Sequence, residues 1–166
     1  IRSNSWNEAS KYGLILGFIS AAYLFLGHLQ MNLGQTGFFS IVISFVIWTA
    51  KVVGCIMLMK HAMTKFVLDN PEATNSDTFR LGAKMALFSA LIFSVITVAD
   101  QLYLFPEYYQ SIYDAQLQEY AKVLPADKVQ EIKELLVDAP KISFIGTFIY
   151  CIAYGTVVSF IISRNV

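Results

Sequence analysis

Four long apolar stretches constrain this chain more than any other feature of its sequence. They run from about Tyr12 to His28, Phe38 to Met59, Leu81 to Phe105 and Ser143 to Ile162. A helix that crosses the hydrocarbon core of a bilayer needs about 20 mostly apolar residues. The first and fourth stretches carry almost no charged residues, whereas a helix of a water-soluble bundle needs a polar outer face. The sequence therefore predicts an all-α integral membrane bundle of four transmembrane helices.

The composition agrees with one membrane domain. Only 14% of the 166 residues are charged, whereas about 25% is usual in soluble domains. The length allows one compact unit, so we expect a single membrane domain over residues 1–166. The formal net charge is zero, which gives no electrostatic reason to expect a nucleic-acid partner. The partner that the composition predicts is the lipid bilayer.

Basic residues near the apolar stretches predict their orientation, because the cytoplasmic ends of membrane helices carry more lysine and arginine. Such residues occur in the amino-terminal segment, around the second connection and at the carboxyl end. They are Arg2, Lys11, Lys60, Lys65, Arg80, Lys84 and Arg164. The third connection carries Lys122, Lys128, Lys133 and Lys141, but it also holds seven acidic residues and is long enough to count weakly. The first connection, residues 29–37, contains none. We expect both termini and the second connection in the cytoplasm, and the first and third connections on the outer side.

The second connection is polar and rich in turn-forming residues. Ser76 or Asp77 follows it directly, and both are residue types that cap the amino-terminal end of a helix. We therefore expect one of these two side chains to cap the third helix.

The third connection, residues 106–142, is the largest segment between the apolar stretches. Apolar and tyrosine residues recur at helical spacing in its first half, and a second apolar stripe follows Pro125. The two stripes are Tyr109, Ile112, Tyr113, Leu117, Tyr120 and Leu124, then Val129, Ile132, Leu135 and Leu136. Pro140 is expected to end the second helix. The pattern predicts an extracytoplasmic helical hairpin between the third and fourth membrane helices, with its tyrosines at the membrane interface.

Five segments of the chain carry a family resemblance. They read KYGLILGFIS, NSDTFRLGAKMALFSALI, YLFPEYYQSI, LPADKVQEIKELLVDAPKI and ISFIGTFIYCIAYGTVVSFIISR. With these segments the chain resembles DUF4199, an uncharacterised family of bacterial membrane proteins found mainly in Bacteroidota. The resemblance implies four membrane helices in a bacterial cytoplasmic (inner) membrane, with a helical insert before the last helix, and no established activity. It does not include Lys51, so a role of Lys51 would be particular to this protein.

Small residues recur every four positions in three of the stretches. The stripes are Gly13, Gly17 and Ala21, then Gly82, Ala86, Ala90 and Ser94, and finally Cys151, Gly155 and Ser159. Small residues let membrane helices approach closely and so gain van der Waals contact. Two interpretations stay open: packing within the bundle, or docking on another subunit, for which Gly13 and Gly17 are the first candidates.

Two ionisable residues within the stretches are candidate functional residues. Lys51 lies near the middle of the second stretch, where a lysine costs about 2.5–3.5 kcal/mol and is a functional hypothesis by default. Three interpretations of Lys51 stay open. Its side chain snorkels to the interface, it pairs with a buried partner in this chain or a neighbour, or it serves transport or catalysis. Asp100 lies near the outer end of the third stretch, where we expect a solvated carboxylate or one paired with Lys141 or with a lysine of the external hairpin. Asp100 and Lys51 differ in depth by about 12 Å, so we expect no direct pair.

The sequence offers no recognisable catalytic site. It has no phosphate-binding glycine loop, nucleophile elbow or HExxH motif, so we expect no enzyme, no cofactor and no metal site. His28 and His61 lie at opposite ends of the predicted bundle and are not expected to share a metal. Cys55 and Cys151 lie in apolar stretches, which favours small packing residues over a disulfide or zinc site.

The function that fits these features best is a non-catalytic accessory or assembly subunit of a larger inner-membrane complex, with other membrane protein subunits as partners. One alternative is a small oligomeric transporter or channel in which Lys51 faces an anion pathway. Another alternative is a membrane enzyme or lipid-handling helper that acts through Asp100 and the tyrosine-rich helix.

Overall fold

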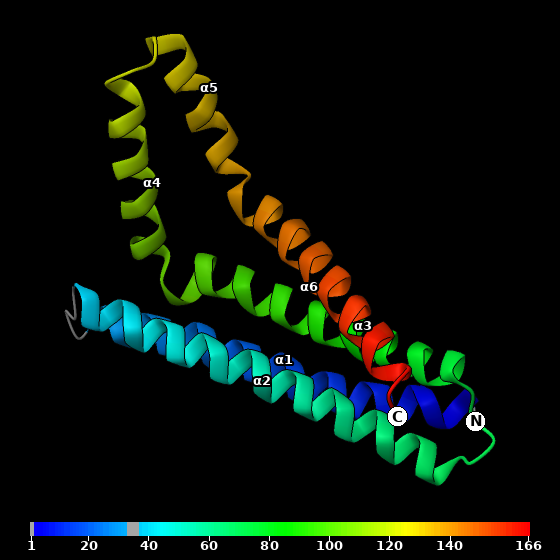
Figure 1. The fold of residues 1–166 in the computed structure, drawn as a ribbon. Helices are drawn as coiled ribbons and strands as arrows, with labels where there is room; N and C mark the ends of the chain where they lie inside the picture. The colour runs from blue at the N-terminus through cyan, green and yellow to red at the C-terminus, as the bar shows by residue number, and fades with distance from the viewer. Residues whose placement is uncertain (1, 33–36) are drawn as a thin grey trace. The chain divides into compact units, whose positions relative to one another are not determined.

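The computed structural model describes residues 2–32 and 37–166, and the side chains of residues 4–30 and 37–166. Helices form nearly all of this part of the chain, and no strand occurs in it. The elements are α1 (Arg2–Asn32), α2 (Phe38–Asp69), α3 (Asn75–Ala99), the π-helical turn η1 (Asp100–Leu104), α4 (Pro106–Ala121), α5 (Ala126–Val137) and α6 (Ala139–Ser163) (Figure 1). The predicted all-α class is confirmed. Residues 33–36 of the predicted first connection and the Arg2 side chain lie outside what is described.

Four helical segments are long and apolar enough to cross a membrane. They are Asn4–Gln30, Phe38–Asp69, Asn75–Leu104 and Ala139–Ser163. Each covers one of the four predicted apolar stretches, except that the third ends one residue before Phe105. The mean hydropathy of their most apolar 18-residue windows lies between 1.6 and 2.3. This finding confirms the prediction of four candidate membrane helices and indicates a membrane protein.

The helices extend beyond the apolar stretches. At its carboxyl end, α2 continues from Met59 to Asp69. With 32 residues, α2 rises about 48 Å, which exceeds the roughly 30 Å of a hydrocarbon core. The added turns contain Lys60, His61 and Lys65. These polar residues suit a part of the helix that lies outside the hydrocarbon core.

A reciprocal pair of hydrogen bonds starts α3. The amide N–H of Thr74 donates to the Asp77 carboxylate at 3.0 Å, and the amide N–H of Asp77 donates to the Thr74 hydroxyl at 3.3 Å. This arrangement is a capping box. The cap is therefore Thr74, and the prediction of Ser76 or Asp77 is wrong in position, because Asp77 closes the box from inside the helix.

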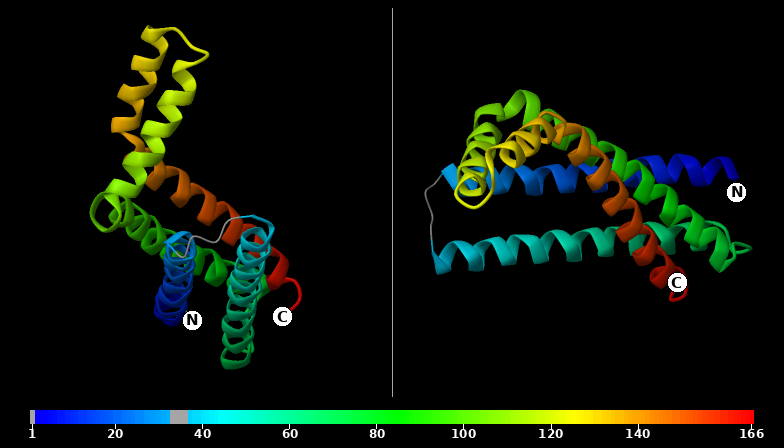
Figure 2. Two further views of the ribbon diagram at one scale, coloured as in Figure 1. Left: turned by 90° about the vertical axis from the view of Figure 1, so that its left-hand side faces the viewer. Right: turned by 90° about the horizontal axis from the view of Figure 1, so that it is seen from above.

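The chain divides into two compact units. The first comprises Ile1–Phe93 and Phe148–Val166, and the second comprises Ser94–Thr147. In the first unit, α1 and α2 run side by side in opposite directions (Figure 2). A tightly packed core joins them to α3 and α6. It contains Ala9, Tyr12, Leu16, Met59, Ala62, Met63, Phe66, Leu81, Met85 and Ile162.

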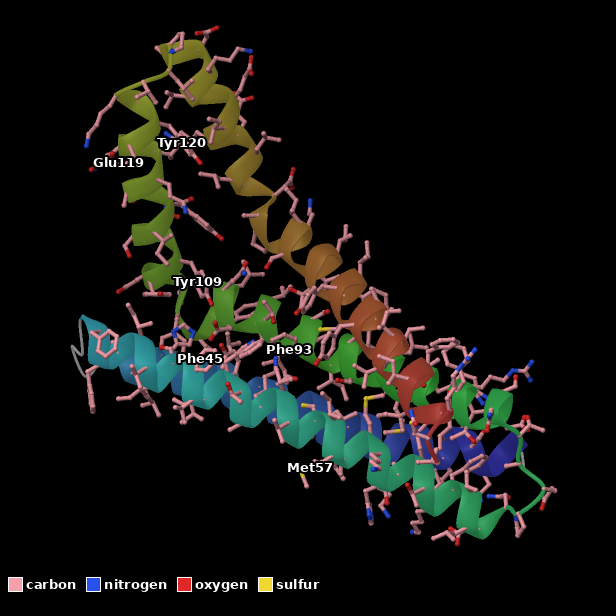
Figure 3. The ribbon with its side chains drawn as sticks, viewed as in Figure 1. Phe45, Met57, Phe93, Tyr109, Glu119 and Tyr120 are labelled. Atoms are coloured by element: carbon pink, nitrogen blue, oxygen red, sulfur yellow. The ribbon has the colours of Figure 1, made fainter. Side chains whose placement is uncertain are left out.

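Away from this core, α2 is scarcely covered by the rest of the chain. No residue of its most apolar window of 18 residues is buried. Phe45 and Met57, labelled in Figure 3, are 64% and 66% exposed. Apolar surface of this extent is costly in water and neutral in lipid, so it agrees with a helix whose solvent is the acyl chains.

In the second unit, α4 and α5 pack against each other as a helical hairpin. Pro106 occupies the first turn of α4, where its missing N–H removes no helical hydrogen bond, and Pro125 caps α5. α5 ends at Val137, and Pro140 lies in the first turn of α6. The helical insert predicted at residues 106–142 is thus present as a hairpin (Figure 3).

Candidate functional site

Lys51 lies half-buried on α2, and its neighbours in the first unit are aromatic rings. The Lys51 ammonium is 4.9 Å from the centre of the Tyr23 ring on α1 and 5.4 Å from that of Phe93 on α3. Both distances fit cation–π contacts, which contribute about 2 kcal/mol when desolvated. Among the described residues, no carboxylate forms an ion pair with Lys51. The two rings therefore stabilise the Lys51 ammonium without supplying a counter-ion.

A cavity of about 100 Å³ lies beside Lys51. All four helices of the first unit contribute to its lining. These residues are Leu16, Ser20, Trp48, Lys51, Val52, Cys55, Met59, Ala86, Ser89, Tyr150, Cys151, Tyr154 and Gly155. Lys51 supplies a cation, Ser20 and Ser89 supply hydroxyl groups, and most other lining groups are apolar. Such a mixture resembles small-molecule sites in general, which are apolar with a few placed polar groups.

The rim of this cavity lies on the surface of the first unit. Trp48, Tyr150 and Tyr154 line it and are 47%, 66% and 40% exposed. The Tyr150 and Tyr154 rings stack, with centres 6.2 Å apart. The cavity therefore opens sideways, past aromatic rings, to the surroundings of the helices.

The small-residue stripes bring α1 and α6 close to α3. A Cβ atom on Gly13 would lie 2.5 Å from Phe88 Cβ, and one on Gly17 would lie 2.8 Å from Ile92 Cβ. Gly82 faces Ser159, and Gly155 faces Ala86. Ala21, Ala90 and Ser94 are buried as well. The faces that carry Gly13 and Gly17 are thus covered by this chain's own α3.

Asp100, the second candidate, is the first residue of η1 and is 0% exposed. Its carboxylate accepts a hydrogen bond from the Tyr109 hydroxyl. Burial raises the pKa of Tyr109 well above its usual range, and the hydrogen bond to Asp100 and the charge of Asp100 raise it further. The suggested partner Lys141 pairs instead with Asp138, at 2.9 Å. π-Helical turns are rare and often mark functional sites. This property makes η1 a candidate part of a functional site.

The profile of a family described as "Protein of unknown function (DUF4199)" matches residues 11–164. The chain belongs to the DUF4199 family. This match confirms the resemblance seen in the sequence and spans the four candidate membrane helices and the hairpin. No curated protein and no solved structure matches the chain. For this DUF4199 protein, function must be argued from its own residues.

A second cavity, of about 250 Å³, lies in the second unit of the DUF4199 chain. Gln101, Tyr109, Gln110 and Tyr113 line it together with apolar residues of the hairpin. Gln101 donates a hydrogen bond to the Ser143 hydroxyl at 2.8 Å. Sequence reasoning missed this cavity and the role of Tyr109, because residues on either side of the turn at Pro106 share no helical periodicity.

Metal-binding residues do not gather in the part of this DUF4199 protein that the structure describes. No group of three or more histidine, cysteine, aspartate or glutamate side chains occurs there in a metal-binding arrangement. His28 is buried near the end of α1, and the His61 ring lies 6.3 Å from the Tyr12 ring. Cys55 and Cys151 both line the cavity beside Lys51 as free thiols.

Proposed function

We propose that this protein is a non-catalytic accessory or assembly subunit of a larger complex in the cytoplasmic membrane of a bacterium. The observation that carries the proposal is the exposure of the apolar side chains of α2. None of its most apolar window is buried, compared with 39% of the corresponding windows of α1 and α3. α2 packs most tightly near Met59, Met63 and Phe66. Toward its amino-terminal end it also contacts α1, for example where Gln30 donates a hydrogen bond to Ser40, but most of its side chains there stay exposed. The exposed face of that length is therefore available to a helix of another subunit.

Small residues on α2 support this use of the helix. Ala50 is exposed, and a Cβ atom on Gly54 would meet nothing within 4 Å. The two residues are four positions apart, the spacing that lets membrane helices approach closely. By contrast, side chains of the same chain already cover four other glycines, which are Gly13, Gly17, Gly82 and Gly155. The docking surface is therefore proposed on α2, at Ala50 and Gly54.

The proposal includes the topology expected from the basic residues, with both termini and the second connection in the cytoplasm and the hairpin outside. Three ion pairs support a water-facing surface for the hairpin and its junction with α6. Lys122 pairs with Glu119, Lys128 with Glu131 and Lys141 with Asp138, at 2.6–3.0 Å, and all six side chains are more than half exposed. Charged side chains of this exposure belong in water and not in acyl chains.

The test is purification of the tagged protein in a mild detergent from its native membrane. We expect the wild-type protein to elute with larger membrane proteins and the Gly54→Leu variant to elute alone. Gly146→Leu is the matched control, because Gly146 lies on α6 and a Cβ there also meets nothing within 4 Å; it should still elute with the complex. A wild-type protein that elutes as a monomer, or equal release by both variants, would overturn the proposal.

A second candidate function is a small oligomeric transporter or channel in which Lys51 faces an anion pathway. The observation in its favour is that Lys51 lines a cavity open to the surface of the first unit. Four helices rarely enclose a pore alone, so the pathway would require several copies. Reconstituted protein should then carry anions across liposomes, and Lys51→Met should abolish the flux. Flux that persists unchanged in Lys51→Met would exclude this candidate.

A further inference from the structure

We propose that the cavity beside Lys51 binds a single-chain amphiphile with one carboxylate, of the long-chain fatty-acid class, taken sideways from the bilayer. The site lies within one chain and does not depend on any partner subunit. Charge, hydrogen-bonding groups, cavity size and the position of the ammonium lead to this ligand class.

The charge of Lys51 calls for an anion. An ammonium within the apolar part of a membrane is costly, and the Tyr23 and Phe93 rings stabilise it without neutralising its charge. The described residues supply no carboxylate to pair with it. A carboxylate brought by a ligand would form a charge-assisted hydrogen bond with the ammonium, which is among the stronger polar contacts in proteins.

Hydroxyl groups in the same cavity suit the second oxygen of such a carboxylate. Ser20 on α1 and Ser89 on α3 both line the cavity with Lys51. A carboxylate accepts several hydrogen bonds, whereas an ammonium and two hydroxyls offer donors. The polar part of the cavity thus matches a monoanionic carboxylate in both charge and donor supply.

The size of the cavity favours a small head group. Its volume of about 100 Å³ is smaller than that of a cavity of about 150 Å³ that holds one benzene molecule. A carboxyl group and its first carbons fit this space, whereas a glycerophosphate head with two acyl chains does not. The rest of a single chain would leave across the exposed Trp48, Tyr150 and Tyr154 side chains at the rim.

The position of the ammonium also decides against a partner helix as the occupant. Lys51 reaches inward, between Tyr23 of α1 and Phe93 of α3. A helix is about 10 Å in diameter and does not enter a gap between packed helices, whereas one acyl chain does.

The test uses the tryptophan at the rim as a reporter. The chain has two tryptophans, Trp6 and Trp48, so a Trp6→Phe background leaves Trp48 as the only one. The protein is placed in nanodiscs of zwitterionic lipid and titrated with dibromostearic acid, whose bromine atoms quench tryptophan on contact, or with its methyl ester. We expect saturable quenching by the acid at concentrations at least tenfold lower than those needed for the ester.

Variants then assign this preference to the charge of Lys51. Lys51→Met should remove the preference for the acid, and Lys51→Arg should keep most of it. Lys60→Met is the matched control, since Lys60 is exposed on the same helix and does not line the cavity; it should leave the preference unchanged. Helix content and elution volume would show that each variant is folded.

Three outcomes would overturn the proposal. Equal quenching by acid and ester would mean that the cavity beside Lys51 recognises only apolar chains. A preference that survives Lys51→Met would place the anion elsewhere. Equal quenching by dibrominated phosphatidylcholine at the same mole fraction would mean ordinary contact with bilayer lipid.

Discussion

The Tyr109 hydroxyl donates a hydrogen bond of 2.5 Å to the carboxylate of Asp100, a side chain with no exposed surface. This bond joins the π-helical turn at the end of α3 to the first turns of α4. Pro106 lies between the two residues and starts α4. The bond therefore ties the hairpin to the membrane helix that precedes it.

Removal of this hydroxyl should loosen the junction. We expect Tyr109→Phe to cost about 1–3 kcal/mol, because it leaves a buried carboxylate oxygen without this donor. Hydrogen exchange at the amides of η1 and α4 should become faster. Tyr120→Phe is the control, since Tyr120 lies on the same helix and is 43% exposed. Equal acceleration in both variants would contradict a specific role for the Tyr109 hydroxyl.

The same hydroxyl predicts a dependence on alkaline pH. The pKa of Tyr109 is raised in the folded protein, mainly by burial. Below about pH 10 the phenol is protonated in both the folded and unfolded states, so its contribution is complete. Above that pH the unfolded chain loses the proton first, and stability falls as the pH rises toward the folded-state pKa.

Absorbance of tyrosinate at alkaline pH should therefore include a late ionisation to which Tyr109 contributes. Tyr109→Phe should lose one residue's share of that late step, and the step should disappear in denatured wild-type protein. The unfolding free energy should fall more steeply above about pH 10 in the wild-type protein than in Tyr109→Phe. Identical titration curves for the two proteins would contradict the assignment.

The crossing of α3 and α6 should be sensitive to a single methyl group. A Cβ atom on Gly82 would lie 2.6 Å from Ser159 Cβ, while the Ser159 hydroxyl donates to the Phe79 carbonyl at 2.9 Å. We expect Gly82→Ala to destabilise the protein by about 1–3 kcal/mol, measured by unfolding in mixed micelles. Gly146→Ala, at an open position, should be neutral or stabilising by up to about 1 kcal/mol. A neutral Gly82→Ala would contradict the close crossing.

The start of α3 distinguishes the structure from the expectation based on the sequence. Thr74→Ala should cost about 1 kcal/mol, because the Thr74 hydroxyl accepts a hydrogen bond from the Asp77 amide. Ser76→Ala should have little effect, since Ser76 is exposed within the helix. The same unfolding measurement compares the two. A larger effect at Ser76 would favour the cap predicted from the sequence.

The proposed topology predicts which residues are reached from outside the cell. With Cys55 and Cys151 changed to serine, a cysteine at Glu131 in α5 should react with a membrane-impermeant maleimide on intact cells. A cysteine at Glu72, in the connection between α2 and α3, should react only after lysis. Both positions are exposed in the structure. The reverse labelling pattern would invert the topology.

Local patterns were enough to predict the helices. Runs of apolar residues predicted the four candidate membrane helices, because membrane crossing depends on length and composition alone. Helical spacing on both sides of Pro125 predicted α4 and α5, since each has an apolar stripe and a proline at its start.

Contacts between distant residues were beyond the same patterns. Lys51 stood out as a lysine in an apolar helix, but nothing in its neighbourhood along the chain indicated Tyr23 and Phe93 as its contacts. The stripe at Gly13 and Gly17 indicated close packing without indicating its partner, which is α3 of the same chain. Periodicity assigns a face to a residue, and only the folded chain decides what that face meets.

The length of α2 has a consequence for handling the protein. On the proposed topology α2 enters the bilayer near Phe38. Since it rises about 48 Å and the hydrocarbon core takes about 30 Å, roughly three of its turns would extend beyond the acyl chains. The short connection between Asp69 and Asn75 would then lie at the end of these helical turns, away from the membrane. A peptide epitope inserted there would be lifted above the lipid head groups, within reach of an antibody fragment large enough to orient this small protein in cryo-electron microscopy.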